Sequence, residues 1–168
     1  MTTTIETNNQ TNQIGDISTE QQKYQALAKA LSHFLADTYT LYLKTQNFHW
    51  NVTGSRFYAL HELFEQHYKE MAPAIDTIAE RIRTIGFLAP GSYTQFMSLT
   101  SIPETEGVAS AEEMILLLVK GNESVSRSAG SALQQAEIAG DAPTADLLTQ
   151  RMKVHQKNVW MLRSLLQE

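Results

Sequence analysis

The feature that most constrains this chain is the spacing of its imidazole and carboxylate side chains in residues 48–80, FHWNVTGSRFYALHELFEQHYKEMAPAIDTIAE. Side chains of these types bind iron or zinc at neutral pH. Gly54 and Ser55 interrupt an otherwise helical pattern, which predicts a helix ending near Asn51, a tight turn, and a second helix from about Ser55 to Ile85. The candidate metal ligands of this stretch are His49, His61, Glu65, Asp76 and Glu80.

Helix geometry divides these ligands into two groups. Glu65 follows His61 by four residues and Glu80 follows Asp76 by four, so each pair shares one helix face. Two antiparallel helices joined by a short turn also bring His49 level with His61. Fifteen residues separate His61 from Asp76, which is about 22 Å along a helix, whereas a metal centre spans about 4 Å. The groups are therefore either unrelated pairs or half-sites that a second copy completes across a two-fold axis.

At these residues the chain resembles the Dps proteins, or mini-ferritins (DNA-binding proteins from starved cells). The resemblance rests on NFHWNVTG around His49, LHELFE around His61 and DTIAER from Asp76, and it extends over about residues 21–166. It implies an all-α, ferritin-like four-helix bundle with a long crossover connection that carries a short helix. It also implies a hollow dodecamer with ferroxidase centres at its two-fold interfaces. Many members of the family carry Asp at the position of Glu65.

The resemblance further implies a ferroxidase that oxidises Fe(II), preferably with hydrogen peroxide, and stores the ferric mineral. His49, His61, Asp76 and Glu80 would then be catalytic iron ligands, with Glu65 as a further metal ligand. Iron is the expected metal, and zinc is a possible competitor for the same donors. Trp50 is either an electron donor beside the centre or an apolar anchor at the dimer interface.

A second family motif is Asp141-Ala-Pro-Thr-Ala-Asp146, whose two aspartates would bind metal in a pore at the three-fold axis. The residues alone favour a helix cap at Asp141, because an aspartate at a helix N-terminus accepts backbone hydrogen bonds and complements the helix dipole. The two roles are compatible at Asp141.

Composition limits the other classes of function. The 168 residues fit one domain, which we expect to span residues 18–168 after a flexible tail at 1–17. There is no cysteine, no apolar run long enough to span a membrane and no secretory signal, so a cytoplasmic protein is expected. A DNA-binding nucleoid protein is the alternative function. The net charge of −5 and the absence of Lys or Arg before Lys23 argue against it.

Two further alternatives follow from the metal ligands. A purely structural bundle would leave the five matched intervals unexplained, and an intrasubunit di-iron centre needs Glu-x-x-His steps, of which the chain has none. His33 and His67 fall off the ligand stripe, so we expect His33 to be unrelated to the metal and His67 to be structural or on the surface. His155 lies on an apolar face, so we expect a core histidine bonded to a neighbour.

The remaining helices are predicted from their ends. A capping box of Ser18 and Gln21 opens the first helix, and one of Ser110 and Glu113 opens the third. A crossover from Gly86 to about Ala109 follows the second helix, and the resemblance implies that its short helix lies at residues 93–97. Gly140 ends the third helix, and the fourth begins at Asp141 and Pro143.

Overall fold

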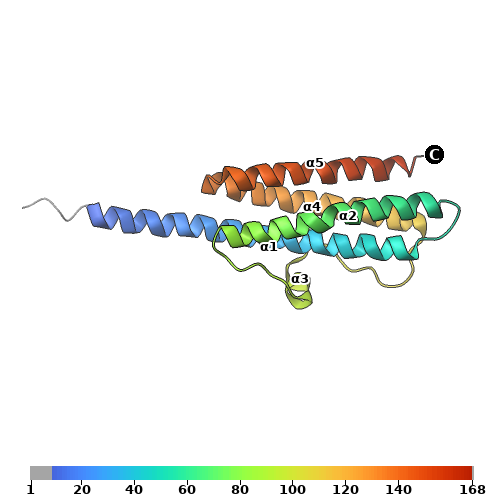
Figure 1. Ribbon diagram of the computed structural model, residues 1–168, viewed down its shortest axis with the longest axis horizontal. Helices are drawn as coiled ribbons and strands as arrows, with labels where there is room; N and C mark the ends of the chain where they lie inside the picture. The colour runs from blue at the N-terminus through green and yellow to red at the C-terminus, as the bar shows by residue number, and fades with distance from the viewer. Residues whose placement is uncertain (1–8, 168) are drawn as a thin grey trace, which may run out of the picture.

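Four long helices lie side by side in this protein, and a short fifth one projects from the crossover (Figure 1). The computed structural model describes the backbone of residues 9–167 and the side chains of residues 19–167. Over this part of the chain every regular element is helical, which confirms the all-α four-helix bundle. The helices are α1 (Asn9–Asn51), α2 (Phe57–Thr84), α3 (Tyr93–Leu99), α4 (Ala111–Ala139) and α5 (Ala142–Ser164).

The bundle consists of two antiparallel hairpins, α1 with α2 and α4 with α5 (Figure 1). The first hairpin turns at Gly54, whose φ of 102° lies in the left-handed region that favours glycine. The second turns at Gly140, whose left-handed conformation ends α4. Because α2 and α4 run in the same direction, the crossover between them must return along the length of the bundle, and it packs α3 against α1.

Buried polar side chains of α1 fasten this crossover. Asp37 accepts hydrogen bonds from Thr100 Oγ1 at 2.9 Å and from the backbone N–H of Ser101 at 2.6 Å. Lys44 Nζ donates to the carbonyl of Pro103 at 2.6 Å and to Thr105 Oγ1 at 2.8 Å. Desolvation lowers the pKa of Lys44, although nearby Glu104 opposes this effect. These bonds hold in place a segment that has little regular structure of its own.

The helix ends largely follow the sequence-based prediction. Both bonds of the capping box at Ser110 and Glu113 are present, and Asp141 caps α5. The predicted beginning of the first helix at Ser18 is wrong, because α1 extends back to Asn9. Once a packed helix is formed, adding a residue costs little, so the capping box does not have to be its first turn. The predicted tail falls partly outside the described residues, and its flexibility stays a prediction.

Small side chains allow α4 to approach its neighbours closely. Ala129, Ala132 and Ala136 are fully buried along its length, and Gly121 faces Leu41 of α1. Large apolar side chains from α1 and α2 fill the remaining space, including Phe34, Leu35, Phe64, Ile78 and Ile82. α2 continues through Pro73 to Thr84.

A layer of polar side chains crosses this core between α2, α4 and α5. His155, which is 0% exposed, donates from Nδ1 to Asn122 Oδ1 at 2.9 Å, and its Nε2 lies 3.4 Å from Arg151 Nη2. Arg151 forms a two-bond ion pair with Glu70. The pKa of His155 is lowered to about 3, mainly by burial and to a smaller extent by the charges of Arg151 and His67. The prediction of a hydrogen-bonded core histidine is confirmed.

Candidate metal half-site

His49, near the end of α1, and His61, near the start of α2, form a stacked pair. Their ring centroids lie 3.8 Å apart with an interplanar angle of 25°. Each imidazole Nδ1 lies 2.8 Å from the backbone carbonyl oxygen of the other residue. A carbonyl oxygen can only accept, so both Nδ1 atoms carry the proton and donate. The bonds thus fix one tautomer in each ring and leave each Nε2 lone pair as a metal donor.

Aromatic rings support this pair. Tyr68 lies edge-on to His49 at 5.3 Å, and Phe57 lies 5.1 Å from His61. His49 is buried and His61 is half-buried. The rings are therefore held before any metal binds, which reduces the ordering cost of binding.

Glu65 lies one turn beyond His61, and its carboxylate forms a 2.6 Å ion pair with Lys69. The hydrogen bond from Lys69 lowers the pKa of Glu65; burial opposes this, and His49 and His61 add smaller lowering effects. Glu65 is therefore ionised at neutral pH, and the influence of both histidines on its pKa places its carboxylate near them. Lys69 is the group that a metal ion would displace from Glu65.

Asp76 and Glu80 are exposed farther along α2. They are not brought to the histidine pair, because α2 is one continuous helix that keeps Asp76 about 22 Å from His61. Within the described residues of one chain, no three His, Cys, Asp or Glu side chains gather in a geometry that could hold a metal ion. A single chain thus presents two separate groups of candidate ligands.

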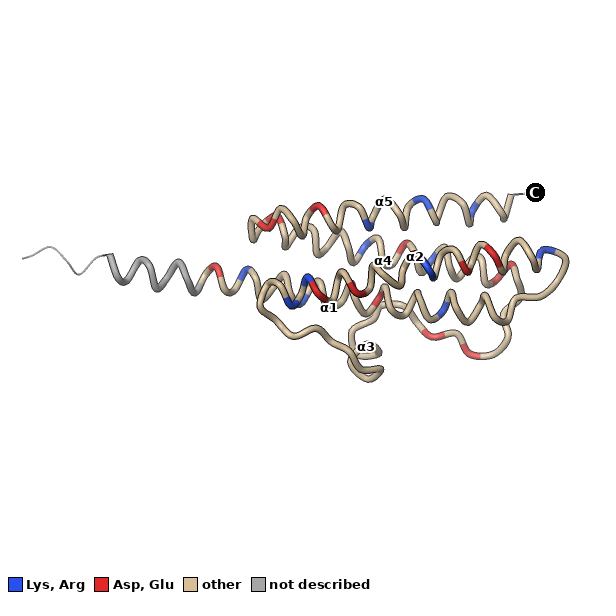
Figure 2. Tube along the Cα trace, in the orientation of Figure 1, with Lys and Arg blue, Asp and Glu red and all other residues tan. Residues whose placement is uncertain are grey.

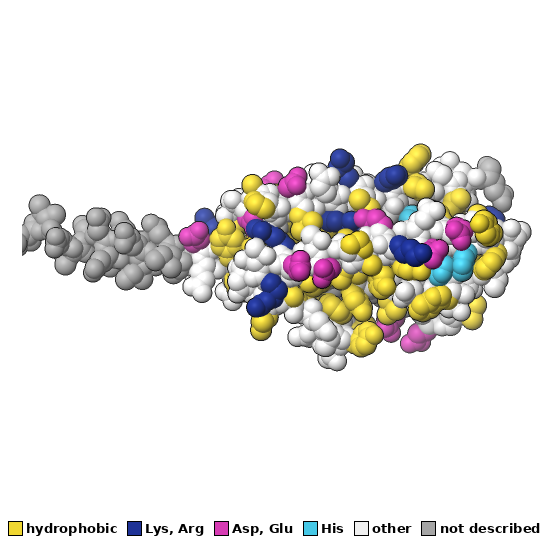
Figure 3. Space-filling model, in the orientation of Figure 1, with side chains coloured by type: hydrophobic (Ala, Val, Ile, Leu, Met, Phe, Trp, Pro, Cys, Tyr) yellow, Lys and Arg dark blue, Asp and Glu magenta, His cyan; other side chains and the backbone are white. Residues whose placement is uncertain are grey.

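Large apolar side chains are exposed around the histidine pair. Trp50, the neighbour of His49, is 61% exposed, and Tyr58 on α2 is 75% exposed. α3, which packs on α1 near Tyr39 and not beside the histidine pair, exposes Tyr93 and Met97 as well. The space-filling view shows histidines near one end of the bundle, with apolar side chains beside them and towards its centre (Figure 3). Exposed apolar patches of this kind mark interaction surfaces.

The two aspartates of the second motif have different surroundings. Asp141 is only 4% exposed. Its two oxygens lie 2.7 and 2.8 Å from Arg81 Nη2, and Thr144 donates to it from Oγ1 at 2.6 Å. Burial raises the pKa of Asp141, but the bonds from Arg81 and Thr144 outweigh it, and the net pKa is lowered. Asp146 is exposed.

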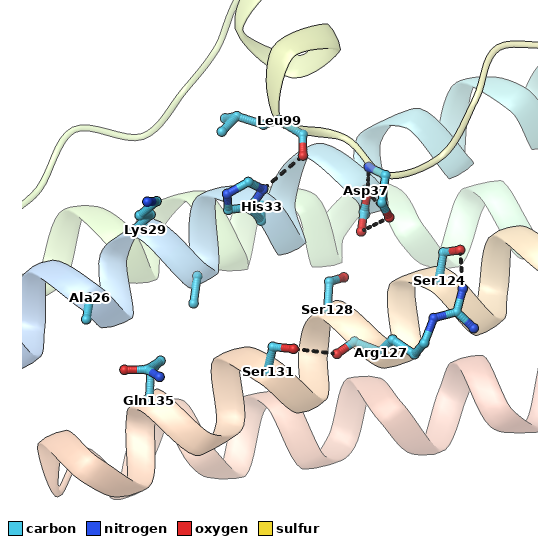
Figure 4. Close-up of a pocket in the computed structure, with 12 residues that line it drawn as sticks. Ala26, Lys29, His33, Asp37, Leu99, Ser124, Arg127, Ser128, Ser131 and Gln135 are labelled. Carbon is cyan, nitrogen blue, oxygen red and sulfur yellow. Dashed lines mark hydrogen bonds between the residues drawn. The ribbon is translucent and has the colours of Figure 1, made fainter.

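A separate cavity of about 610 Å³ lies between α1 and α4 (Figure 4). His33 faces it and donates from Nδ1 to the carbonyl of Leu99 at 2.9 Å. His33 precedes His49 by sixteen residues on α1, about 24 Å along the helix. This cavity is therefore distinct from the histidine pair.

The sequence did not reveal two charged residues that organise these regions. Arg81 pairs with Asp141 across 60 positions, and Arg151 pairs with Glu70 across 81. No local spacing connects partners so far apart. The pairing of Glu65 with Lys69 was also missed, although oppositely charged residues four apart on a helix are a signal that could have revealed it.

Comparisons with known proteins agree with this architecture. Residues 28–168 match the ferritin-like domain family. The chain is 38% identical to an uncharacterized low temperature-induced protein of Nostoc over 89% of this chain and 84% of that protein. It is 37% identical to the DNA protection during starvation protein of Brevibacillus brevis, over 85% of this chain and 96% of the relative.

A solved structure extends the comparison to three dimensions. The Dps protein of Vibrio cholerae, described as a member of a broad superfamily of ferritin-like diiron-carboxylate proteins, superposes with a TM-score of 0.83. It is 30% identical, and the match covers 87% of this chain and 92% of that one. The protein is thus a ferritin-like four-helix bundle, and within that class it belongs to the Dps family. None of the helices in the described part of the chain has the length and apolarity needed to cross a membrane.

Proposed function

We propose that this protein is an iron-storing mini-ferritin that oxidises Fe(II) at centres shared between two subunits. His49 and His61 of one subunit and Asp76 and Glu80 of its partner would bind the ferrous ion. The observation that carries the proposal is the reciprocal hydrogen bonding of the histidines, which leaves both Nε2 atoms as donors. The family membership of the chain supports it.

The donor set suits ferrous oxidation. Imidazole nitrogens bind Fe(II), and hard carboxylate oxygens favour the Fe(III) that oxidation produces. Hydrogen peroxide, the preferred oxidant, takes one electron from each of two ferrous ions and, with two protons, gives two waters. Glu65 would join as a further ligand once Lys69 is displaced. Zinc would compete for the same donors.

Assembly of several subunits would complete the iron-oxidising centres and would form the cavity that stores the mineral. A two-fold axis perpendicular to α2 would pack the two copies of this helix antiparallel and set the histidine pair of each chain opposite the carboxylates of the other. Trp50 would be covered at this interface, where it serves either as an apolar anchor or as an electron donor. Six such dimers, forming a dodecamer, would enclose the ferric mineral, and Asp146 together with Asp141 would line its three-fold pores.

DNA binding is the weaker candidate. DNA binding is considered because the Brevibacillus brevis relative is named a DNA protection during starvation protein. The net charge of this chain is −5, and Lys and Arg are interspersed with Asp and Glu along α1, α2 and α4 (Figure 2). On α5 the four basic residues Arg151, Lys153, Lys157 and Arg163 follow Asp146. Phosphate neutralisation needs clustered positive charge, so we propose that duplex DNA binds weakly or not at all.

Covalently linked dimers test the shared centre. If one subunit carries His61→Ala and the other Asp76→Ala, both lesions fall in one centre and the second centre is intact. Stopped-flow oxidation of Fe(II) by peroxide should then retain about half of the wild-type fast phase. Each substitution placed in both subunits should abolish it.

The matched control joins a wild-type subunit to one that carries both substitutions. Each shared centre then lacks one ligand, and the fast phase should be lost. If each subunit held its own centre, the first dimer would be inactive and this control would be half active. That reversed pattern would refute the shared site.

A further inference from the structure

A continuous series of aromatic rings leads away from the histidine pair along the contact between α1 and α2. From His49 the centroid distances are 5.3 Å to Tyr68 and 6.0 Å from Tyr68 to Tyr42. They continue with 6.0 Å from Tyr42 to Tyr39 and 4.6 Å from Tyr39 to Phe96 of α3. Each step lies within the range for rings in contact.

Helix geometry produces this alignment. Tyr42 lies two turns before His49 on α1, and Tyr68 lies two turns after His61 on α2. The two helices are antiparallel, so both tyrosines lie on the same side of the histidine pair. Tyr39 extends the row by one more turn.

Apolar packing alone does not account for tyrosine at all three positions. Where aromatic side chains are fully buried in the bundle, they are phenylalanines, as at Phe34 and Phe64. Tyr39, Tyr42 and Tyr68 are instead only half-buried, so their phenol protons can reach water. The Tyr42 oxygen also accepts a 3.3 Å hydrogen bond from Gln46 Nε2. A phenol can give up an electron together with its proton, which a phenyl ring cannot do.

We propose that Tyr68, Tyr42 and Tyr39 form an electron relay that supplies peroxide with a second electron when a centre holds only one ferrous ion. This inference rests on the proposed oxidation of Fe(II) at His49 and His61. Peroxide needs two electrons to become two waters, and one ferrous ion supplies one. Without a second donor, the O–O bond would break to hydroxide and a hydroxyl radical.

The electron and proton balance is complete with one tyrosine. One peroxide, one Fe(II), one tyrosine and one proton from water give one Fe(III), one neutral tyrosyl radical and two waters. The phenol proton and the added proton end in these waters. Tyr68 then regains an electron and a proton from Tyr42, and Tyr42 from Tyr39. A later ferrous ion, with one proton, reduces the radical and becomes Fe(III).

The relay ends at Tyr39. The next ring, Phe96, is buried and has no hydroxyl, so it covers the last tyrosine without extending the chain of oxidisable groups. The tyrosyl radical therefore stays on one of the three tyrosines until the next ferrous ion reduces it.

Freeze-quench electron paramagnetic resonance of the whole protein tests the relay. Wild-type protein loaded with less Fe(II) than it has centres and mixed with hydrogen peroxide should give a radical signal. Ring-deuterated tyrosine should narrow that signal, whereas a radical on Trp50 would not change. Tyr68→Phe should lose the tyrosyl signal and release more hydroxyl radical to a spin trap. Tyr42→Phe should confine the radical to Tyr68.

Tyr24→Phe is the matched control, because Tyr24 is a half-buried tyrosine of α1 that has no part in the ring series. It should keep the wild-type signal. Rapid Fe(III) formation in the wild type without a tyrosyl radical would overturn the relay and leave the proposed oxidation intact. An unchanged signal in Tyr68→Phe would also overturn it. If the wild type forms no Fe(III) rapidly, the proposed function fails, and the relay fails with it.

Discussion

At the scale of single residues, hydrogen bonds decide what each ionisable group can do. His49 and His61 differ from His155 in this respect, although all three are imidazoles inside a bundle. The first two give their Nδ1 protons to backbone carbonyls and keep Nε2 free. His155 donates its Nδ1 proton to Asn122, and the guanidinium of Arg151 lies beside its Nε2. The positive charge of Arg151 keeps a metal ion from binding at that nitrogen. The same side chain is therefore a candidate ligand in one place and a core element in the other.

The two aspartates of the second motif should respond differently to removal of their charge. Asp141→Asn weakens the ion pair with Arg81 at a buried helix cap, so we expect the free energy of unfolding to fall by about 3 kcal/mol. Asp146→Asn removes an exposed charge and should change it by less than about 0.5 kcal/mol. Urea unfolding measures both. Equal destabilisation would contradict the capping role of Asp141.

The rate of iron uptake tests the proposed role of Asp146 in the three-fold pore, separately from the capping role of Asp141. If Asp146 lines a pore, Asp146→Asn should slow Fe(II) oxidation at limiting iron concentration without changing stability. An uptake rate equal to that of the wild type would remove Asp146 from the proposed pore.

The buried histidines predict a loss of stability in mild acid. Burial lowers the pKa of His67 to about 4, against a smaller opposing effect of Glu70, and the pKa of His155 is lowered to about 3. In the unfolded chain their ordinary pKa is 6.5, so below that pH the unfolded state binds more protons. Stability is full above pH 6.5 and falls as the pH drops towards 4, by about 1.4 kcal/mol per pH unit for each histidine.

Urea unfolding of the wild type and of His155→Gln between pH 7 and pH 5 measures this dependence. The variant should be less stable at pH 7, because it disturbs the layer formed with Asn122 and Arg151, but its stability should depend less steeply on pH. An unchanged slope would show that His155 does not titrate between the folded and unfolded states.

At the scale of elements, the sequence predicted the helices well because their ends carry local signals. Ser110 with Glu113, and Gly140 before Asp141, mark helix ends through contacts within a few residues. The beginning of α1 was not predicted, because a helix can extend past a good cap. The separation of the carboxylates from the histidines was predictable, since it requires only the rise of one helix. The reciprocal histidine bonds were not, because they depend on how the turn at Gly54 sets α1 against α2.

Two glycines of α4 provide a matched test of its packing. A Cβ on Gly130 would lie 3.8 Å from Met152 Cε, an ordinary contact, whereas a Cβ on Gly121 would lie 2.6 Å from Leu41 Cδ1. Alanine favours a helix over glycine, so Gly130→Ala should raise the free energy of unfolding by about 0.5 to 1 kcal/mol. Gly121→Ala should lower it by about 1 kcal/mol, because Leu41 is fully buried and must leave its rotamer. Stabilisation by both substitutions would show that Leu41 has room to move.

At the scale of the whole molecule, the exposed surface of one chain is the main reason to expect assembly. Trp50 and Tyr58 are exposed next to a histidine pair whose proposed partners lie on another subunit, and α3 exposes Tyr93 and Met97 farther along the bundle. An isologous interface would bury these side chains and complete two centres in a single step. Assembly and catalysis should therefore be lost together when this face is altered.

A charged side chain on α3 tests this link. Met97→Glu places a carboxylate in the proposed apolar interface, where its desolvation opposes association. Native mass spectrometry of the wild type should give about twelve times the 18.9 kDa mass of one chain. Met97→Glu should give smaller species without the fast oxidation of Fe(II), but with the same helix content. Gln156→Glu on α5, across the bundle from α3 (Figure 1) and away from Asp146, adds the same charge at another exposed position and should keep both the mass and the activity. A Met97→Glu protein that retains the assembly and the fast phase would place the two-fold interface elsewhere, and a stable wild-type monomer would remove the shared centre altogether.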